Sequence, residues 1–176
     1  MNNNPSFELP SKVAVVTSFE NVLVDVDKFK TFIAVKAEAA VKTGDADELE
    51  QVESLTELNN VIDVQVKKTI DILQNVDGFK VSYEEFKSIL LALSTIDLSC
   101  RTLKVSLSKQ QGAEKLTEQV DVIYSHIVGI NDLIKDTLYD VRSWNIEYGE
   151  YRRTSYVPVK YVPKKKASVK KTPVNV

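Results

Sequence analysis

Residues 113–148 read AEKLTEQVDVIYSHIVGINDLIKDTLYDVRSWNIEY. Apolar residues recur in this stretch at steps of three or four, which is the period of one face of an α-helix. They are Leu116, Val120, Ile123, Ile127, Ile130, Ile134, Leu138, Val141, Trp144 and Tyr148. So long an apolar stripe needs a partner of matching length, and the segments before it are expected to supply one.

Three earlier segments show the same period, and the sequence predicts four long helices, over residues 11–43, 46–76, 82–111 and 113–148. Ser11 and Asp45 are the expected N-caps of the first two helices. Ser82 is followed three residues later by Glu85, which is the capping-box spacing. These signals place the helix starts independently of the apolar period.

Gly44, Gly78 and Gly112 mark the expected ends of the first three helices. The links between the helices are short, and short links favour antiparallel neighbours. The predicted fold is therefore all-α, an up-down-up-down four-helix bundle over residues 11–149, preceded by a flexible lead-in over residues 1–10. A surplus of apolar residues lies off the inner faces and either widens the core or marks an interface: Val24, Val64, Leu91, Leu98 and Val105.

Charge divides the chain in two. Residues 1–150 hold 15 Lys and Arg and all 25 Asp and Glu, a balance of −10, whereas residues 151–176 hold eight basic residues and no acid. In the second part a five-residue repeat, Tyr-Val-Pro-x-Lys, occurs twice in tandem from Tyr156 to Lys165. Proline fixes φ and pushes its predecessor toward extended geometry, so residues 150–176 are expected to form an extended basic tail.

Basic residues interleaved with tyrosines suit a polyanion, because Lys and Arg neutralise phosphates and Tyr stacks on unpaired bases. The residues predicted to bind a polyanion or partner are Arg152, Arg153, Tyr156, Lys160, Tyr161, Lys164, Lys165, Lys166, Lys170 and Lys171. Two alternatives stay open: a purely solubilising end, and docking of the tail in another subunit's groove. An acidic set could receive such a tail: Asp45, Asp47, Glu48, Glu50 and Glu53.

No usual catalytic or metal-binding pattern is found in the sequence. His126 is the only histidine, so the paired Glu-x-x-His motifs of a di-iron bundle cannot be built. There is no glycine-rich phosphate loop, and Cys100 lies on an apolar helix face, where a cysteine usually acts as an inert apolar residue. We therefore expect a protein that is not an enzyme and that has no catalytic residues, bound metal or cofactor.

Residues 75–86 invite comparison with a calcium-binding EF-hand loop, but the register fails. With Gly78 as the sixth loop residue, the first is Leu73, which cannot ligate calcium. A helix stop at Asp77-Gly78 followed by the capping box explains the same residues, so no calcium site is expected.

The sequence also bears on location and modification. A single cysteine suits a reducing compartment, and the first residues have neither the basic nor the apolar region of a signal peptide. No apolar run is long enough for a membrane span, and a cytoplasmic location is expected, a nuclear or virion-associated one being compatible. Residues 152–155, Arg-Arg-Thr-Ser, match a basophilic kinase site, where a phosphate would reduce the tail's positive charge.

These observations predict a structural or assembly protein, forming a homo-oligomer or larger assembly, whose basic tail tethers an acidic bundle to nucleic acid or to a neighbouring subunit. A virion or nucleoprotein component would fit. The alternative is a membrane-active bundle, which opens its amphipathic helices onto an anionic lipid surface. Against that alternative, the polar faces of the helices are acidic overall and would be repelled by anionic lipid.

Overall fold

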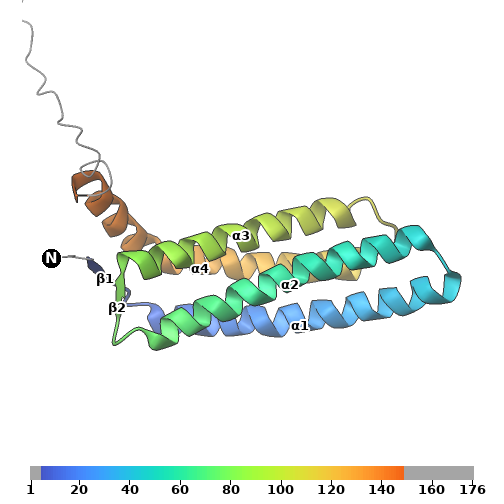
Figure 1. Cartoon of the computed structure of the whole chain (residues 1–176), viewed down its shortest axis with the longest axis horizontal. Helices are drawn as coiled ribbons and strands as arrows, with labels where there is room; N and C mark the ends of the chain where they lie inside the picture. Colours follow the sequence, from blue (N-terminus) through green and yellow to red (C-terminus); the bar gives the residue numbers. More distant parts are fainter. Residues whose placement is uncertain (1–4, 149–176) are drawn as a thin grey trace, which may run out of the picture. The chain divides into compact units, whose positions relative to one another are not determined.

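The computed structural model describes residues 5–148 (Figure 1). Within this range, two short strands and four α-helices follow one another as β1 (Ser6–Glu8), α1 (Lys12–Thr43), α2 (Ala46–Asn75), β2 (Lys80–Ser82), α3 (Tyr83–Leu107) and α4 (Glu114–Tyr148). The chain divides into two compact units, residues 1–142 and 143–176. The bundle belongs to the first unit, and the described part of the second is the C-terminal end of α4.

Contacts between helices show that successive helices run antiparallel. Lys36 Nζ, near the end of α1, lies 3.8 Å from Glu48 Oε1 at the start of α2. Lys104 Nζ, near the end of α3, lies 2.6 Å from Asp121 Oδ1 near the start of α4. The all-α four-helix bundle predicted from the sequence is confirmed. The last helix lies against the first, since Ser11 Oγ, just before α1, donates to the Leu133 carbonyl of α4 at 2.7 Å.

The core is formed by the apolar faces that the helical period predicted. On α1 the fully buried side chains include Phe19 and Phe29, and on α4 they include Ile123 and Ile130. Each helix contributes a stripe to one continuous apolar cluster. No helix among the described residues combines the length and the apolar character that a membrane span requires.

Two of the three predicted caps form as expected. Asp45 accepts the backbone N–H groups of Asp47 and Glu48 at 3.0 and 3.1 Å. In the capping box, Ser82 N–H donates to Glu85 Oε2 at 2.7 Å and Glu85 N–H donates to Ser82 Oγ at 3.2 Å. Ser11 precedes α1 but makes no side-chain cap, because its hydroxyl donates to a carbonyl of α4 instead.

The third helix ends earlier than predicted, at Leu107 rather than at residue 111. Leu107 is the last buried residue of α3, and the polar residues after it have no apolar face to pack. The backbone tightens there, with Gln110 N–H donating to the Leu107 carbonyl three residues back at 3.0 Å. Gly112, with a φ of 70°, then belongs to the turn and does not end the helix directly.

The predicted flexible lead-in over residues 1–10 is corrected where the structure describes it. Ser6–Glu8 pairs antiparallel with Lys80–Ser82, with Phe7 opposite Val81. Leu9 follows the strand and is completely buried, and its N–H donates to the Phe79 carbonyl at 2.7 Å. A strand of three residues has too few positions to show a period, so its apolar residues gave no signal in the sequence.

Candidate functional site

The ten residues predicted to bind a polyanion or partner, from Arg152 to Lys171, lie outside the described residues 5–148. The kinase-site match at residues 152–155 lies there too. The described residues include the acidic bundle but not the predicted site, so the structure bears on that site only through the bundle's own polar groups. Within the bundle, three places hold polar groups of chemical interest: a buried carboxylate on α1, the turn after α2, and the acidic start of α2.

Asp25 places a carboxylate on the inner side of α1, where only 8% of its side chain is exposed. Lys28 Nζ lies 3.0 Å from Asp25 Oδ1, and Gln119 Nε2 of α4 donates to the same oxygen at 3.1 Å. His126 Nε2, also on α4, lies 3.1 Å from the second oxygen, Asp25 Oδ2. A buried carboxylate is costly unless it is paired and hydrogen-bonded, and these three groups supply that pairing.

This cluster is arranged to join two helices. Gln119 Nε2 donates to the backbone carbonyl of Asp25 as well, at 3.2 Å, so one side chain of α4 holds both the main chain and the side chain of α1. The hydroxyl beside His126 in sequence, on Ser125, donates to the Val122 carbonyl of its own helix at 2.7 Å. Such contacts favour the boundary-histidine interpretation of His126 over a catalytic one, because a Ser-His-Asp site needs a hydroxyl directed at the imidazole.

The buried thiol of Cys100 is also unsuited to chemistry at neutral pH. Cys100 lies in the core on α3, and burial raises the pKa of its thiol to about 12. The thiolate is the nucleophilic form of cysteine, so this side chain is protonated and shielded in the folded protein. Its surroundings agree with the inert apolar role predicted from its position on the helix.

The turn after α2 is occupied by a lysine from a distant part of the sequence. Lys12 Nζ donates to the carbonyls of Val76 and Gly78 at 2.7 and 2.8 Å. A positive charge at the C-terminal end of a helix complements the helix dipole. In this arrangement the ammonium group uses backbone oxygens of the segment that resembled a calcium loop. The described residues also contain no group of three or more His, Cys, Asp or Glu side chains that could hold a metal ion.

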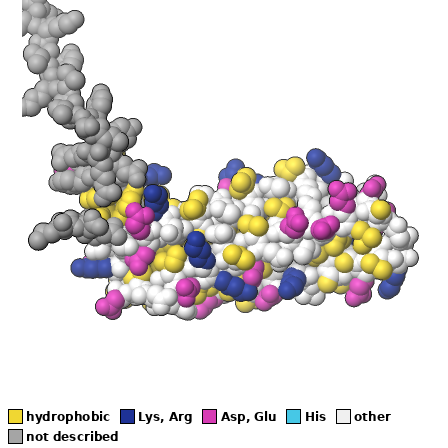
Figure 2. All heavy atoms as spheres, viewed as in Figure 1, with side chains coloured by type: hydrophobic (Ala, Val, Ile, Leu, Met, Phe, Trp, Pro, Cys, Tyr) yellow, Lys and Arg dark blue, Asp and Glu magenta, His cyan; other side chains and the backbone are white. Residues whose placement is uncertain are grey.

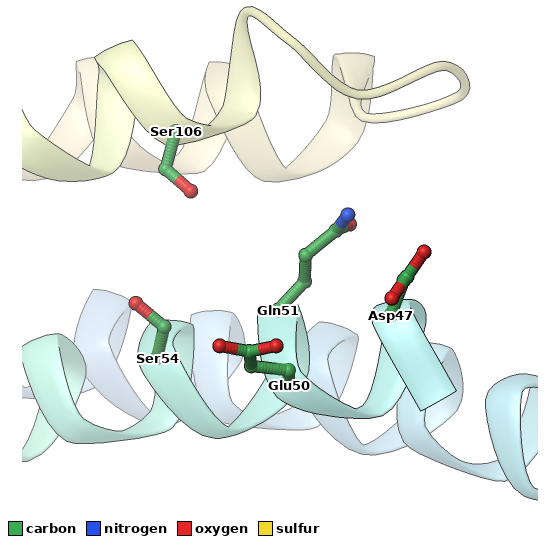
Figure 3. Close-up of a pocket in the computed structure, with 5 residues that line it drawn as sticks. All are labelled: Asp47, Glu50, Gln51, Ser54 and Ser106. Carbon is green, nitrogen blue, oxygen red and sulfur yellow. The ribbon is translucent and has the colours of Figure 1, made fainter. Parts of the chain in front are cut away.

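The acidic start of α2 borders a hollow of about 390 Å³ between α2 and α3. Figure 3 shows Ser106 of α3 on one side, facing Gln51 and Asp47 of α2, with Glu50 and Ser54 beside them. The residues around the hollow include two acids and no base, so its electrostatic character favours a cation.

The acidic set is thus divided by role. Asp45 caps α2, and Glu48 faces Lys36, so these two carboxylates serve the fold. Asp47 and Glu50 border the hollow and leave its rim negatively charged. Both side chains are exposed, as is that of Glu53, the remaining member of the set.

Sequence reasoning missed Asp25, Lys12 and Gln119 as partners across the bundle. The only available signal was an acid on an otherwise apolar helix face, at Asp25 between Val22 and Val26. Which side chains meet it depends on the packing of α1 against α4, which no local pattern encodes.

Comparisons of the chain with protein-family models, with curated proteins and with solved structures found no match. Function is therefore inferred from the residues and contacts of this chain itself. The features that carry the inference are the charge division of the sequence and the structural use of the bundle's polar groups.

Proposed function

We propose that this protein is a non-enzymatic structural or assembly protein, in which an acidic helical bundle is tethered by its basic C-terminal arm, residues 151–176. The observation that carries the proposal is the charge division: −10 over residues 1–150 and +8 over residues 151–176. Such a division is typical of a compact body with an arm for a polyanion. A cytoplasmic, nuclear or virion-associated setting would suit this role.

The proposal is supported by the structural roles of those side chains in the bundle whose residue types could carry out chemistry. Asp25 joins α1 to α4, Lys12 caps the end of α2, and Cys100 is buried with a raised pKa. These residue types often carry catalysis, and here each has a structural task. The body is thus suited to be a stable platform, with recognition assigned to the arm.

Phosphate is the chemical class that the arm suits best. Eight positive charges with no acid would release counterions from a nucleic acid, and the interleaved tyrosines would stack on unpaired bases. The alternative partner is an acidic protein surface, for which Asp47 and Glu50 of a neighbouring subunit are candidates. Both partners would make binding weaken as salt increases, so the experiment has to present them separately.

The test compares two variants of the full chain that lose the same number of charges. In the arm variant, five lysines become glutamine: Lys164, Lys165, Lys166, Lys170 and Lys171. In the matched control, five exposed lysines of the bundle become glutamine: Lys30, Lys42, Lys68, Lys115 and Lys135. Binding to labelled single- and double-stranded DNA and RNA is measured by fluorescence anisotropy over a salt series.

We expect the wild type and the control to bind with log affinity falling linearly with log salt. The arm variant should lose about 3 to 5 from that slope, since each neutralised phosphate contact contributes about 0.7 to 0.9. Equal binding by the wild type and the arm variant would contradict a nucleic-acid role for the arm. Flotation with anionic and neutral liposomes completes the test, because binding to anionic vesicles alone would favour the membrane-active alternative.

A further inference from the structure

The turn between α2 and β2 contains the only Asp-Gly pair of the chain, Asp77 and Gly78, and the chain has no Asn-Gly pair. We call residues 76–79 the Asp-Gly turn. It lies at one end of the bundle (Figure 1), and Figure 2 shows charged side chains at the surface of that end. Asp77 and Gly78 are both exposed. Gly78 has a φ of 63°, and a Cβ placed on it would meet no atom within 4 Å, so its backbone nitrogen is not shielded by neighbouring groups.

The peptide group that joins Asp77 to Gly78 is free between two peptide groups that are held. Neither the Asp77 carbonyl nor the Gly78 N–H has a hydrogen-bond partner among residues 5–148, and within the same range the Asp77 carboxylate has neither a hydrogen bond nor an ion pair. The carbonyls on either side, of Val76 and Gly78, accept from Lys12 Nζ at 2.7 and 2.8 Å. Backbone groups that lack a protein partner are exposed to water and keep their own reactivity.

An aspartate followed by glycine can cyclise with the next backbone nitrogen. The nitrogen of Gly78 loses its proton and bonds to Cγ of Asp77, and a carboxyl oxygen leaves as water, which produces a five-membered succinimide. Water then adds to the main-chain carbonyl carbon of Asp77 and breaks its bond to that nitrogen. The chain now continues through Cβ and Cγ as isoaspartate. One water is released and one is consumed, and no group is oxidised or reduced.

The other described aspartates lack the conditions for this reaction. All of them except Asp45 lie within α1 to α4, where the N–H of the following residue is held by the hydrogen bonds of the helix. Asp45 lies outside the helices, but its carboxylate accepts the N–H groups of Asp47 and Glu48 at 3.0 and 3.1 Å. A free carboxylate, a free nitrogen and a following residue without a side chain therefore occur together only at Asp77 among residues 5–148.

We infer that the Asp-Gly turn is a modification site, at which Asp77 of the folded protein isomerises spontaneously to isoaspartate and thereby loosens residues 5–9. The product adds one bond, about 1.5 Å, to the main chain between Val76 and Gly78. Hydrogen bonds of this type extend only to about 3.2 Å, so the added length exceeds the slack in the two Lys12 contacts, and we expect at least one of them to be lost.

The N-terminal segment is the part of the fold next to this change. Leu9 N–H donates to the Phe79 carbonyl at 2.7 Å, one residue beyond Gly78, and Lys12 follows three residues after Leu9. Displacement of the Asp-Gly turn is thus transmitted first to residues 5–9, whereas the core of α4 does not touch the turn through any of these bonds. This inference does not rest on the proposed role of the basic arm, and its tests share no variant with the nucleic-acid assay.

The first test follows isoaspartate formation during incubation at neutral pH, in the folded full chain and in a synthetic peptide of residues 69–80. Trypsin releases the same peptide from the chain, because it cleaves after Lys68 and Lys80. Liquid chromatography separates the isomers, and electron-transfer fragmentation assigns the modified residue. We expect the rate at Asp77 in the folded chain to lie within about tenfold of the rate in the peptide, since the reaction needs no local unfolding.

Two controls belong to this experiment. Asp71 lies in the same peptide but inside α2, and it should stay unmodified in the folded chain. Asp77→Glu keeps the charge but would require a six-membered ring, so this variant should form no isomer at residue 77. Circular dichroism confirms that the variant is folded.

The second test measures hydrogen exchange in the isomerised chain, after its separation from the unmodified chain by chromatography. We expect the protection of the Leu9 N–H to fall at least about tenfold, because the opening of residues 5–9 becomes easier, while amides around Ile123 in the core of α4 keep their protection.

The remaining outcomes contradict the inference. A rate at Asp77 more than about tenfold below that of the peptide, or no product in the folded chain at all, would show that the fold protects the Asp-Gly turn. Isoaspartate at Asp71 in equal amount would place the reaction in the unfolded chain. Equal protection of Leu9 in the isomerised and unmodified chains would rule out the loosening of residues 5–9.

Discussion

Asp25 illustrates how one polar residue can specify the pairing of two helices. Its carboxylate lies between the apolar Val22 and Val26, and it is accepted in the core because Lys28, Gln119 and His126 surround it. Any rotation of α4 against α1 would remove Gln119 from both the carboxylate and the backbone carbonyl of Asp25. We interpret the cluster as a determinant of packing register, a role known for buried polar groups in helical assemblies.

We expect Asp25→Ala to lower the free energy of unfolding by about 1–3 kcal/mol, because the hydrogen bonds to a charged group are lost and Gln119 keeps only the backbone carbonyl of residue 25 as a partner there. Asp27→Ala, at an exposed position of the same helix, should stay within about 0.5 kcal/mol and corrects for the better helix propensity of alanine. Asp25→Asn should fall between them. Urea denaturation measures all three, and equal stability of Asp25→Ala and Asp27→Ala would refute the register role.

Cys100 gives a pH-dependent prediction at the same scale. Burial raises the pKa of its thiol from 9.0 to about 12, so between these values the folded state keeps a proton that the unfolded state releases. The contribution to stability is complete below pH 9 and is lost as the pH rises toward 12, by roughly 1 kcal/mol per pH unit.

The measurement is the difference in unfolding free energy between the wild type and Cys100→Ala from pH 7 to about 11, in which the titration of other groups cancels. The difference should shrink above pH 9. Iodoacetamide supplies an independent check: at pH 8 it should alkylate the unfolded chain quickly and the folded chain slowly, since only the thiolate reacts. Fast alkylation of the folded protein would contradict the burial of this thiol.

At the scale of elements, the N-terminal segment is an integral part of the fold. Pro5 accepts the Tyr83 N–H at 2.9 Å, and the Glu8 carbonyl accepts Thr137 Oγ1 of α4 at 2.7 Å. Together with the β1–β2 pairing and the buried Leu9, these bonds connect residues before α1 with the start of α3 and with α4. The segment thus joins elements that are far apart in the sequence.

Leu9→Ala should therefore destabilise the protein by about 2–5 kcal/mol, the cost of truncating a leucine in a helix core, although Leu9 lies outside every helix. Val13→Ala, at a position of α1 that is 68% exposed, is the control and should change little. Guanidinium denaturation followed by circular dichroism measures both. Wild-type stability of Leu9→Ala would show that the segment detaches from the bundle without cost.

At the scale of the whole molecule, the charge distribution separates two tasks. Residues 5–148 hold 24 acids and 15 bases, a balance of −9, with the excess on α2 and α4, while the eight cations of the arm lie in residues 151–176. The proposed tether uses the arm, whereas the bundle carries the excess of acids. If the wild type bound no nucleic acid but the arm variant changed the oligomeric state, the arm would be acting on a neighbouring subunit, and Asp47 and Glu50 would be the first residues to change.

The number of helices, their direction and their buried faces followed from the sequence alone. Apolar period, capping box and glycine turns are local signals, and each acts within a few residues of its own position. Asp45, Ser82 and Glu85 could be assigned in this way, and the structure confirms them. The polar cluster could not be predicted, because Gln119 meets Asp25 only after 94 residues of chain have folded back.

Only the tertiary structure decided where the surplus apolar residues lie: Val24, Val64, Leu91, Leu98 and Val105. In the sequence they could either widen the core or remain on the surface, and the structure leaves all five exposed. The physical reason is geometric, since four helices close a core once each contributes one stripe, and an apolar residue on the opposite side has no fifth element to pack against. The same closure positions Lys12 at the end of α2 and Leu9 in the core, contacts that depend on which ends of the helices meet.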